Sequence, residues 1–469
     1  MGSEMDKTGA DLGTSRTQRL VMTLTRMLEA GEPQPGGRLP SIRQAAEAHG
    51  VSKNTMAEVY DRLVASGHLE ARRGAGYFSR IPRPRLPHTA ARHVSQAIDL
   101  VSLLREQLDQ SYEVRPGDGR PPASWMENSE LGAHFRMVCG RRSSMVEFGY
   151  GSSWGYPPLR ERISLMLEER SIRCGPEQLL LTHGANHALD LIIRRFVEPG
   201  DTVFVDDPGY YPLFGKLKLA KAQVIGIRRL ADGPDLEDLA DKLTKYQPRL
   251  FFTQSLAHNP TGGSLDLHGA HSLLRFAESH HFQIVEDDVF ADLLPPLLPR
   301  LAALDQLNRV IYVGTFAKTL SASLRVGYVA AHRETTIALS DIKLVTTVAT
   351  SDFAERLVYD LIMEGHYLRH LRRLRQRVKT ATDDALRQLI PTGLCFPQTS
   401  YGGFYLWAEL PADVDEIELS QDAAGQGIFL APGCVFRPDR QAGPPALRLN
   451  VAHAGNPRFI AFLNRVLKP

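Results

Sequence analysis

Short apolar runs alternate with helical segments through the middle of this chain, and this alternation restricts the possible folds more than any other feature. The runs are residues 179–182, 202–205, 250–253, 282–285 and 309–313. Strands separated by helices build an α/β architecture with a mainly parallel central sheet. Ligands in such folds bind beyond the carboxyl ends of the strands. The residues that follow each run are therefore the first place to look for a site.

Polar, aromatic and glycine residues follow all five runs. They are His183-Gly184-Ala185-Asn186, Asp206-Asp207-Pro208-Gly209-Tyr210, His258-Asn259-Pro260-Thr261-Gly262, Glu286-Asp287-Asp288 and Gly314-Thr315-Phe316-Ala317-Lys318. Each group alone is ambiguous, because Asn-Pro-Thr-Gly is often a turn, an acidic triplet can be a metal site or a solvated loop, and a single lysine usually lies on the surface. Parallel strands end at the same edge of a sheet, so we expect these groups to share one rim.

One part of this rim is suited to a phosphate. Gly184, Ala185 and Asn186 open a predicted helix, and the free N–H groups at a helix start bind anions. Thr315 and Arg325 follow the fifth run and can add further phosphate donors.

The other part of the rim is suited to an aromatic aldehyde. Lys318 can form a Schiff base with an aldehyde, and a buried Asp287 can hold a pyridinium nitrogen protonated. Asn259 can donate to a phenolate oxygen, and Tyr210 offers a ring face. Aldehyde, phosphate, phenolate and pyridinium together describe pyridoxal 5′-phosphate.

A change in composition divides the chain. Residues 80–87 contain three prolines and three arginines, and proline favours an extended, stiff path. We expect an N-terminal domain over 14–80, a linker over 81–110, and a large effector domain over 111–469.

Charge and cysteine usage exclude several classes of protein. The whole chain has a net charge of +2, whereas 38–85 contains nine basic and four acidic residues, so a basic footprint is local. No apolar run reaches the roughly 18 residues that cross a bilayer, and no signal peptide is evident. The four cysteines form no CxxC pair, so we expect neither zinc nor disulfides, and a cytoplasmic location.

The N-terminal domain has the pattern of a winged helix-turn-helix. Ser41 followed by Gln44 is a capping box that starts a helix, Ser52 can cap the next helix, and Gly67 can end it. Residues 69–78 then read as two strands around a glycine turn. A three-helix bundle with a solvated charged face is the alternative.

The pattern Leu39-Pro-Ser-Ile-Arg43, Gly50-Val-Ser-Lys-Asn-Thr55 and Arg73-Gly-Ala-Gly76 resembles the GntR-type winged helix. In such domains the start of the recognition helix reaches base edges in the major groove. The DNA contacts that the resemblance implies are Arg43, Lys53, Asn54, Thr55, Arg73 and Gly74. Ala57 stands where several members carry a basic residue, so the operator sequence does not transfer.

The large domain resembles the fold-type-I, class I and II aminotransferases over about 95–469. The motifs are His258–Gly262, Glu286–Asp288, Gly314–Lys318 with Leu324-Arg-Val-Gly327, and Leu447-Arg-Leu-Asn450. The resemblance implies a Schiff-base lysine at Lys318, a partner of the pyridine nitrogen at Asp287, a ring-oxygen contact at Asn259, a stacking ring at Tyr210, a phosphate contact at Arg325 and a substrate-carboxylate contact at Arg448.

The same resemblance implies a homodimer with shared sites, because Tyr150 matches the tyrosine that reaches the partner subunit's phosphate. One position departs from the pattern. Many members have a tyrosine three residues after the pyridine aspartate, and this chain has Phe290 there. A phenol that would contact the coenzyme oxygen is missing from that position.

The complete order of winged helix, linker and aminotransferase-like domain resembles the MocR/GabR family of transcription regulators. This implies a regulator that binds double-stranded operator DNA and senses a small amino compound, expected to be anionic, by Schiff-base exchange at Lys318. An active aminotransferase with a DNA-binding appendage is the alternative, so enzyme activity stays open. A protein-interaction dimer with an inactive pocket is a third reading, and it predicts a colourless protein.

Overall fold

The computed structural model describes residues 16–72, 74–80, 100–126, 130–138, 149–397, 402–440 and 443–467. The chain divides into two compact units, Met1–Thr89 and Ala90–Pro469, which we call the N-terminal unit and the effector unit. No helix in these ranges is long and apolar enough to cross a membrane.

The N-terminal unit is a winged helix-turn-helix. Its elements are α1 (Arg16–Glu29), α2 (Ile42–Ala48), α3 (Lys53–Ala65), β1 (Leu69–Arg72) and β2 (Gly76–Ser79). The predicted capping box is present, because Ser41 Oγ accepts from the Gln44 backbone N–H and the Gln44 side chain accepts from the Ser41 N–H. Met56, Val59 and Leu63 of α3 are fully buried, and β1 pairs with β2 as an antiparallel wing.

The effector unit contains a large, mostly parallel sheet. Its strand order is β3 (Leu179–Thr182), β10 (Gly327–Ala330), β9 (Val310–Thr315), β8 (Gln283–Asp287), β7 (Pro248–Thr253), β4 (Thr202–Asp207), β5 (Gln223–Leu230) and β6 (Gly233–Pro234). β10 is antiparallel to β3 and β9, whereas β9, β8, β7, β4 and β5 are parallel neighbours. The five runs predicted from the sequence are strands of this sheet.

Both faces of the sheet are buried under helices. Phe204 and Phe251 point into one apolar cluster, while Val203 and Phe252 belong to another. The helices are α7 (Pro157–Glu168), α8 (Ala185–Phe196), α9 (Tyr211–Leu219), α10 (Leu236–Lys245), α11 (Leu267–Ser279), α12 (Leu301–Asp305), α13 (Arg333–Thr347) and α14 (Asp352–Met363). Alternate residues of a strand face opposite sides, which explains the nearly continuous apolar runs.

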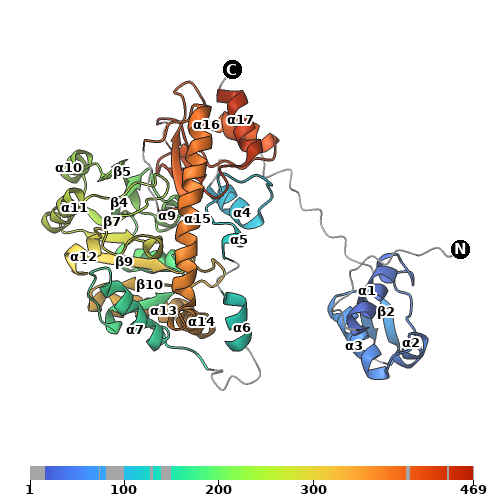
Figure 1. The fold of residues 1–469 in the computed structure, drawn as a ribbon. Helices are drawn as coiled ribbons and strands as arrows, with labels where there is room; N and C mark the ends of the chain where they lie inside the picture. Colours follow the sequence, from blue (N-terminus) through green and yellow to red (C-terminus); the bar gives the residue numbers. More distant parts are fainter. Residues whose placement is uncertain are drawn as a thin grey trace. The chain divides into compact units, whose positions relative to one another are not determined.

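A long helix, α15 (His366–Leu389), leads from this part to a smaller sheet formed by β11 (Tyr405–Glu409) and β12 (Ala446–Asn450) (Figure 1). Helices α16 (Glu416–Gly425) and α17 (Pro457–Leu467) accompany the smaller sheet. The shorter pieces are α5 (Ala123–Met126), α6 (Leu131–Val138) and the 3-10 turns Pro176–Gln178, Ala291–Leu293, Ile390–Thr392 and Gly433–Phe436.

The predicted linker is too long at its carboxyl end. Residues 81–99 lie outside the described part of the chain, but Leu100–Asp109 form helix α4. This helix packs on the effector unit, because Leu103 is buried in an apolar cluster with Trp407 and Phe436. The leucines in 100–108 have the spacing of an amphipathic helix. The linker was predicted instead from the proline-rich stretch that precedes them.

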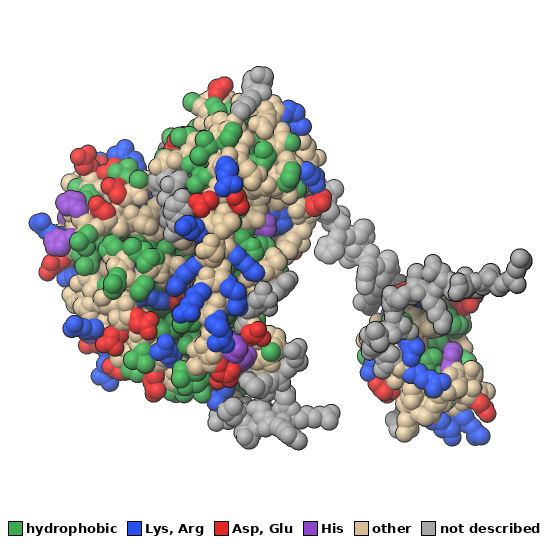
Figure 2. Space-filling view, viewed as in Figure 1, with side chains coloured by type: hydrophobic (Ala, Val, Ile, Leu, Met, Phe, Trp, Pro, Cys, Tyr) green, Lys and Arg blue, Asp and Glu red, His purple; other side chains and the backbone are tan. Residues whose placement is uncertain are grey.

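The charge of the effector unit is not evenly spread. Lys and Arg side chains gather over α15 on the face shown in Figure 2. They include the exposed Arg369, Arg372, Arg373 and Lys379. Basic character in this protein is therefore not confined to the N-terminal unit.

Candidate functional site

The carboxyl ends of the strands in the large sheet meet the smaller sheet at one pocket. Seven residues singled out from the sequence line it: Ala185, Asn186, Tyr210, Asn259, Asp287, Lys318 and Arg448. They come from positions up to 263 residues apart in the chain. Of the other predicted effector-domain residues, Gly184 directly precedes Ala185 and Arg325 contacts the turn at Gly184. Thr315 and Tyr150 do not line this pocket.

Lys318 lies just beyond β9 with its amine at the pocket. Nζ donates to the carbonyl oxygen of Gly119 at 2.7 Å and to the hydroxyl of Tyr405 at 3.3 Å. The Tyr405 hydroxyl also donates to the Gly119 oxygen, at 2.9 Å. The amine is therefore held by neutral oxygen atoms and is not tied to a carboxylate by these contacts.

Asp287 ends β8 and turns its carboxylate into the same pocket. Oδ2 accepts a hydrogen bond from Gln254 Nε2 at 2.8 Å, whereas the buried Oδ1 has no partner among the described residues. Burial raises the pKa of Asp287 to about 6, against the lowering effects of the Gln254 hydrogen bond and Lys318. An unpartnered, buried carboxylate oxygen suits a cationic N–H donor, such as a protonated pyridine nitrogen.

The three acidic residues at the carboxyl end of β8 have separate roles. Glu286 accepts from Ser255 and from two N–H groups at the start of α12, and Asp288 pairs with Arg300 at 2.6 Å. Asp287 alone faces the pocket, so the triplet is neither a metal site nor a solvated loop. Within the described ranges, the metal-like grouping is His134, Glu364 and His366, which does not include the triplet.

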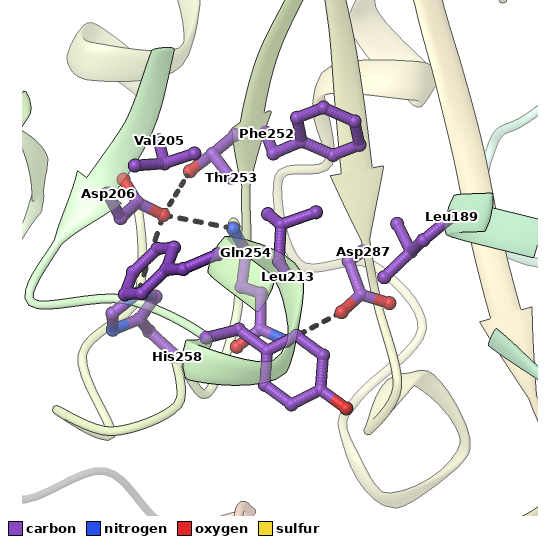
Figure 3. Close-up of a pocket in the computed structure, with 11 residues that line it drawn as sticks. Leu189, Val205, Asp206, Leu213, Phe252, Thr253, Gln254, His258 and Asp287 are labelled. Carbon is purple, nitrogen blue, oxygen red and sulfur yellow. Dashed lines mark hydrogen bonds and ion pairs between the residues drawn. The ribbon is translucent and has the colours of Figure 1, made fainter. Parts of the chain in front are cut away.

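Gln254 supports this arrangement from behind, and the sequence analysis missed it. Its side-chain oxygen accepts from the Asn259 N–H at 2.7 Å, and its own backbone N–H donates to Asp206 Oδ2 at 3.2 Å. Figure 3 shows Gln254 between Asp206 and Asp287, with His258 next to Asp206. Burial lowers the pKa of His258 to about 4. The available signal was position, since Gln254 directly follows β7.

Arg448 occupies the middle of β12 and is almost fully buried. Its Nη2 donates to the Gly117 oxygen at 2.7 Å and its Nη1 to Asn259 Oδ1 at 3.3 Å. Nε has no hydrogen-bond partner in the part of the chain that the structure describes. The guanidinium lies 4.7 Å from the ring centroid of Tyr405. Because Asn259 uses its oxygen for Arg448, its amide N–H groups are left to face a ligand.

The start of α8 forms the anion end of the site. Gly184 precedes the helix with φ +73°, and no described side chain caps its N–H groups. Arg325 lies against this turn, since its Nη2 donates to the His183 oxygen at 2.8 Å. A Cβ atom at Gly184 would approach that nitrogen to 3.0 Å, so glycine keeps the cradle open. The Thr315 hydroxyl donates to the Val326 oxygen at 3.2 Å and accepts from the Ala317 N–H at 3.1 Å.

Several lining residues were not predicted. They are Leu104, Gln107, Gly119, Tyr211, Pro212, Gln254, Val289 and Tyr405. Tyr405 comes from the smaller sheet and Gln107 from α4, and no strand-end pattern marks either residue. Tyr150 is 90% exposed, which is compatible with a contact outside its own chain.

Most of the residues predicted to contact DNA are exposed on the N-terminal unit. Lys53 and Asn54 are exposed at the start of α3, and Arg43 is exposed on α2. Thr55 is half-buried, and its hydroxyl lies 2.8 Å from that of the capping Ser52. Gly74 is exposed in the wing turn with φ +76°, whereas Arg73 lies outside the described residues.

Comparisons with known protein families match both units. The family described as bacterial regulatory proteins, gntR family, matches residues 16–78, and aminotransferase class I and II matches residues 114–459. The second match covers most of the chain. It contains every residue that lines the pocket except Leu104 and Gln107, which belong to α4.

Relatives and solved structures agree with this division. The probable rhizopine catabolism regulatory protein MocR of Rhizobium meliloti is 29% identical over 442 residues, covering 88% of this chain and 86% of its own. The HTH-type transcriptional regulator YdcR of Escherichia coli is 27% identical over 89% of this chain and 91% of its own.

Among solved structures, the α-aminoadipate aminotransferase LysN of Thermus thermophilus, complexed with N-(5′-phosphopyridoxyl)-L-leucine, superposes with a TM-score of 0.71 and 27% identity, covering 80% of this chain and 96% of its own. The kynurenine aminotransferase of Pyrococcus horikoshii has the same TM-score at 24% identity, covering 78% and 93%. Both units and their order therefore place the chain in the class I and II aminotransferase family and, within it, among the MocR-type regulators that carry a GntR winged helix.

Proposed function

We propose that this protein is a transcription regulator that uses pyridoxal 5′-phosphate, joined to Lys318, to sense a small amino compound. The observation that carries the proposal is the pocket in which the Lys318 amine and the unpartnered Oδ1 of Asp287 occur together, in a chain that also has an exposed recognition helix. The family of regulators to which its relatives belong supports the same conclusion.

The residues present fit this coenzyme. Asp287 would hold the pyridine nitrogen, Asn259 the ring oxygen, and Tyr210 the ring face. The start of α8 and Arg325 would bind the phosphate. When bound, the coenzyme supplies an aldehyde that Lys318 and an amino compound can occupy in turn. LysN, which binds a phosphopyridoxyl-amino acid in a similar fold, supports this assignment.

Arg448 supports an anionic effector. Its guanidinium is buried, faces the pocket, and keeps one N–H without a partner among the described residues. A carboxylate bound there would satisfy that donor, because arginine and carboxylate form strong charge-assisted pairs. The proposed effector is therefore an amino compound with an acidic group.

We expect substitution of Arg448 by glutamine to remove the preference for that acidic group. The wild-type protein should exchange Lys318 for L-leucine at least tenfold more readily than for 3-methylbutylamine, the same molecule without its carboxylate. In the Arg448→Gln variant the two compounds should act at similar concentrations. Titration of the coenzyme absorbance measures both. Arg458→Gln, an exposed arginine paired with Glu113 at 2.7 Å, is the control. An unchanged preference in Arg448→Gln would contradict the assignment.

The DNA-binding part of the proposal rests on α3. The helix N-terminus carries Lys53 and Asn54 on an exposed surface, and residues at this position reach base edges when such a helix enters the major groove. Arg43 and the wing residues Arg73 and Gly74 would contact the backbone and set the register. The predicted partner is double-stranded operator DNA.

Binding to DNA from the region upstream of its own gene tests the function directly. We expect Arg43→Ala and Lys53→Ala each to weaken binding by about 5- to 30-fold. Loss of a phosphate contact should also reduce the slope of log affinity against log salt by about one. Arg62→Ala is the matched control, because Arg62 lies on the same helix as Lys53 and pairs with Glu58 at 2.6 Å. Equal affinities for all three variants and the wild type would refute the proposal.

An active aminotransferase is the second candidate, and the presence of Lys318, Asp287 and Arg448 in one pocket favours it. Lys318 can carry a proton once an amino compound has displaced it. Turnover of an amino donor and a keto-acid acceptor, measured by the appearance of the new keto acid, distinguishes the two functions. Catalysis of many cycles per chain would establish the enzyme, whereas a single stoichiometric exchange is the result expected for a sensor.

We further propose a homodimer. Tyr150 matches the tyrosine that reaches the phosphate of the partner subunit in class I and II aminotransferases. Its exposure supports a dimer, because an exposed side chain is free to reach a second subunit. Loss of coenzyme affinity in Tyr150→Phe, with the sedimentation behaviour of a dimer retained, is the expected result.

A further inference from the structure

The free amine of Lys318 has a defined position in this structure. Nζ bridges the Gly119 carbonyl and the Tyr405 hydroxyl, and the hydroxyl in turn donates to the same carbonyl. Tyr405 is itself almost fully buried, with its ring under the Arg448 guanidinium and 5.7 Å from the ring of Phe290. These three groups form a small closed set, which we call the amine rest: Lys318 Nζ, Gly119 O and Tyr405 Oη.

The Gly119 side of the amine rest belongs to the segment that follows α4. Arg115 joins this segment to α4 through an ion pair with Glu106, and its Nε donates to Asp118 at 2.9 Å. A Cβ atom at Gly119 would lie 3.1 Å from the side-chain amide of Gln107, another α4 residue. The lysine amine is therefore in contact with the segment that directly follows α4, and α4 is the first described element after residues 81–99.

We propose that the amine rest holds Lys318 whenever it is not joined to the coenzyme, and that Tyr405 is the positioning residue that sets how readily the lysine is released. The inference rests on the proposed coenzyme function. When Nζ is bonded to the coenzyme, its hydrogen bonds to Gly119 and Tyr405 must be given up. When an amino compound replaces the lysine on the coenzyme, Nζ again donates to Gly119 and Tyr405. The bond to Gly119 connects the lysine to the segment that follows α4.

The covalent step shows why the amine rest opposes coenzyme binding. The lysine ammonium and the aldehyde combine to give a protonated C=N bond, and the aldehyde oxygen leaves as one water molecule. Nζ thereby exchanges three N–H donors for one. The hydrogen bonds in the amine rest are present in the coenzyme-free protein and form again after the lysine is released. They therefore stabilise both states in which the Lys318 amine is not bonded to the coenzyme.

The sign of the effect can be tested with two forms of the coenzyme. Pyridoxal 5′-phosphate reacts with Lys318, whereas pyridoxamine 5′-phosphate occupies the same site without using the lysine. In Tyr405→Phe the coenzyme-free protein loses one hydrogen bond to the amine. We therefore expect its affinity for pyridoxal 5′-phosphate to rise about five- to tenfold and its affinity for pyridoxamine 5′-phosphate to stay unchanged. Equilibrium dialysis of the full-length, coenzyme-stripped protein measures both. Tyr312→Phe, a buried tyrosine of β9 away from the pocket lining, is the control.

Each other outcome contradicts the inference. A fall in affinity for both forms would show that the Tyr405 phenol contacts the coenzyme itself, in the role that Phe290 lacks. Unchanged affinities for both would show that the hydroxyl does not hold the lysine. If the wild-type protein binds neither form of the coenzyme, the proposed function itself is refuted. That result comes from the wild-type protein alone and does not depend on the Tyr405→Phe variant.

Hydrogen exchange gives a second, independent readout. Saturation of the coenzyme-loaded protein with hydroxylamine frees Lys318 chemically, whatever the natural effector is. We expect backbone amides in residues 110–120 to exchange more slowly after this treatment in the wild-type protein, and to change less in Tyr405→Phe. The same protection in both proteins, or none in either, would overturn the link between the lysine and the segment behind α4.

Discussion

Substitution of Lys318 by alanine is expected to abolish the visible absorbance band of the lysine-bound coenzyme and to weaken coenzyme binding at least 100-fold. The reason is that Lys318 is the only lysine among the described residues that line the pocket, so no other amine there can form the covalent bond. Absorbance spectra of the purified protein after addition of pyridoxal 5′-phosphate, followed by dialysis, measure the band and its retention.

Lys245→Ala is the matched control, because Lys245 is an exposed lysine that pairs with Asp241 and does not line the pocket. Coloured, dialysis-resistant protein in the Lys318→Ala variant would mean that another amine holds the coenzyme. A colourless wild-type protein would instead favour the reading of an inactive pocket.

Substitution of Asp287 by asparagine should weaken coenzyme binding by about 10- to 100-fold and make the coenzyme-free protein more stable. The affinity falls because Gln254 donates to one atom of residue 287, which must then be the amide oxygen. The amide NH₂ would face the pyridine nitrogen, where a negative acceptor is required. Weaker coenzyme binding together with a more stable coenzyme-free protein is the result expected where a bound ligand compensates for a buried charge.

The sign of the stability change follows from the pKa of Asp287, which burial raises from 3.8 to about 6. A carboxyl that binds its proton more tightly when folded loses stability as the pH rises from about 4 to about 6, and does not regain it above that range. At pH 7.5 the cost is about 3 kcal/mol. Urea unfolding should therefore show Asp287→Asn more stable by about 1–3 kcal/mol at pH 7.5, with the difference vanishing near pH 4. A less stable Asp287→Asn protein at pH 7.5 would contradict the argument.

Local patterns were sufficient to predict much of the fold. Five strands were correctly predicted because their residues are apolar on both faces, as a sheet covered by helices on both sides requires. The helix starts at Ser41 and Ser52 were equally clear, because capping depends on residues only three apart. The predicted carboxyl end of the linker was wrong because no local pattern decides it. Whether 100–109 is free or packed depends on Trp407 and Phe436, which lie about 300 residues away in the chain.

The acidic triplet shows the limit of such patterns at the site. Sequence alone left a metal site, a solvated loop and a coenzyme contact open for Glu286, Asp287 and Asp288. The structure separates them by their partners, since Glu286 binds the start of α12 and Asp288 binds Arg300. Only Asp287 is left with an unpartnered oxygen in the pocket.

The sequence by itself determined the two-unit organisation, the parallel sheet, and the candidacy of Lys318, Asp287, Asn259 and Arg448, because strand ends and short motifs are local features. Only the tertiary structure decided that Gln254, Gly119 and Tyr405 surround them. These residues come from a strand end, the segment behind α4 and the smaller sheet, and chain positions so far apart meet only through packing of the two sheets. The identity of a hydrogen-bond partner depends on distance and direction in space, and neither is written in the order of residues along the chain.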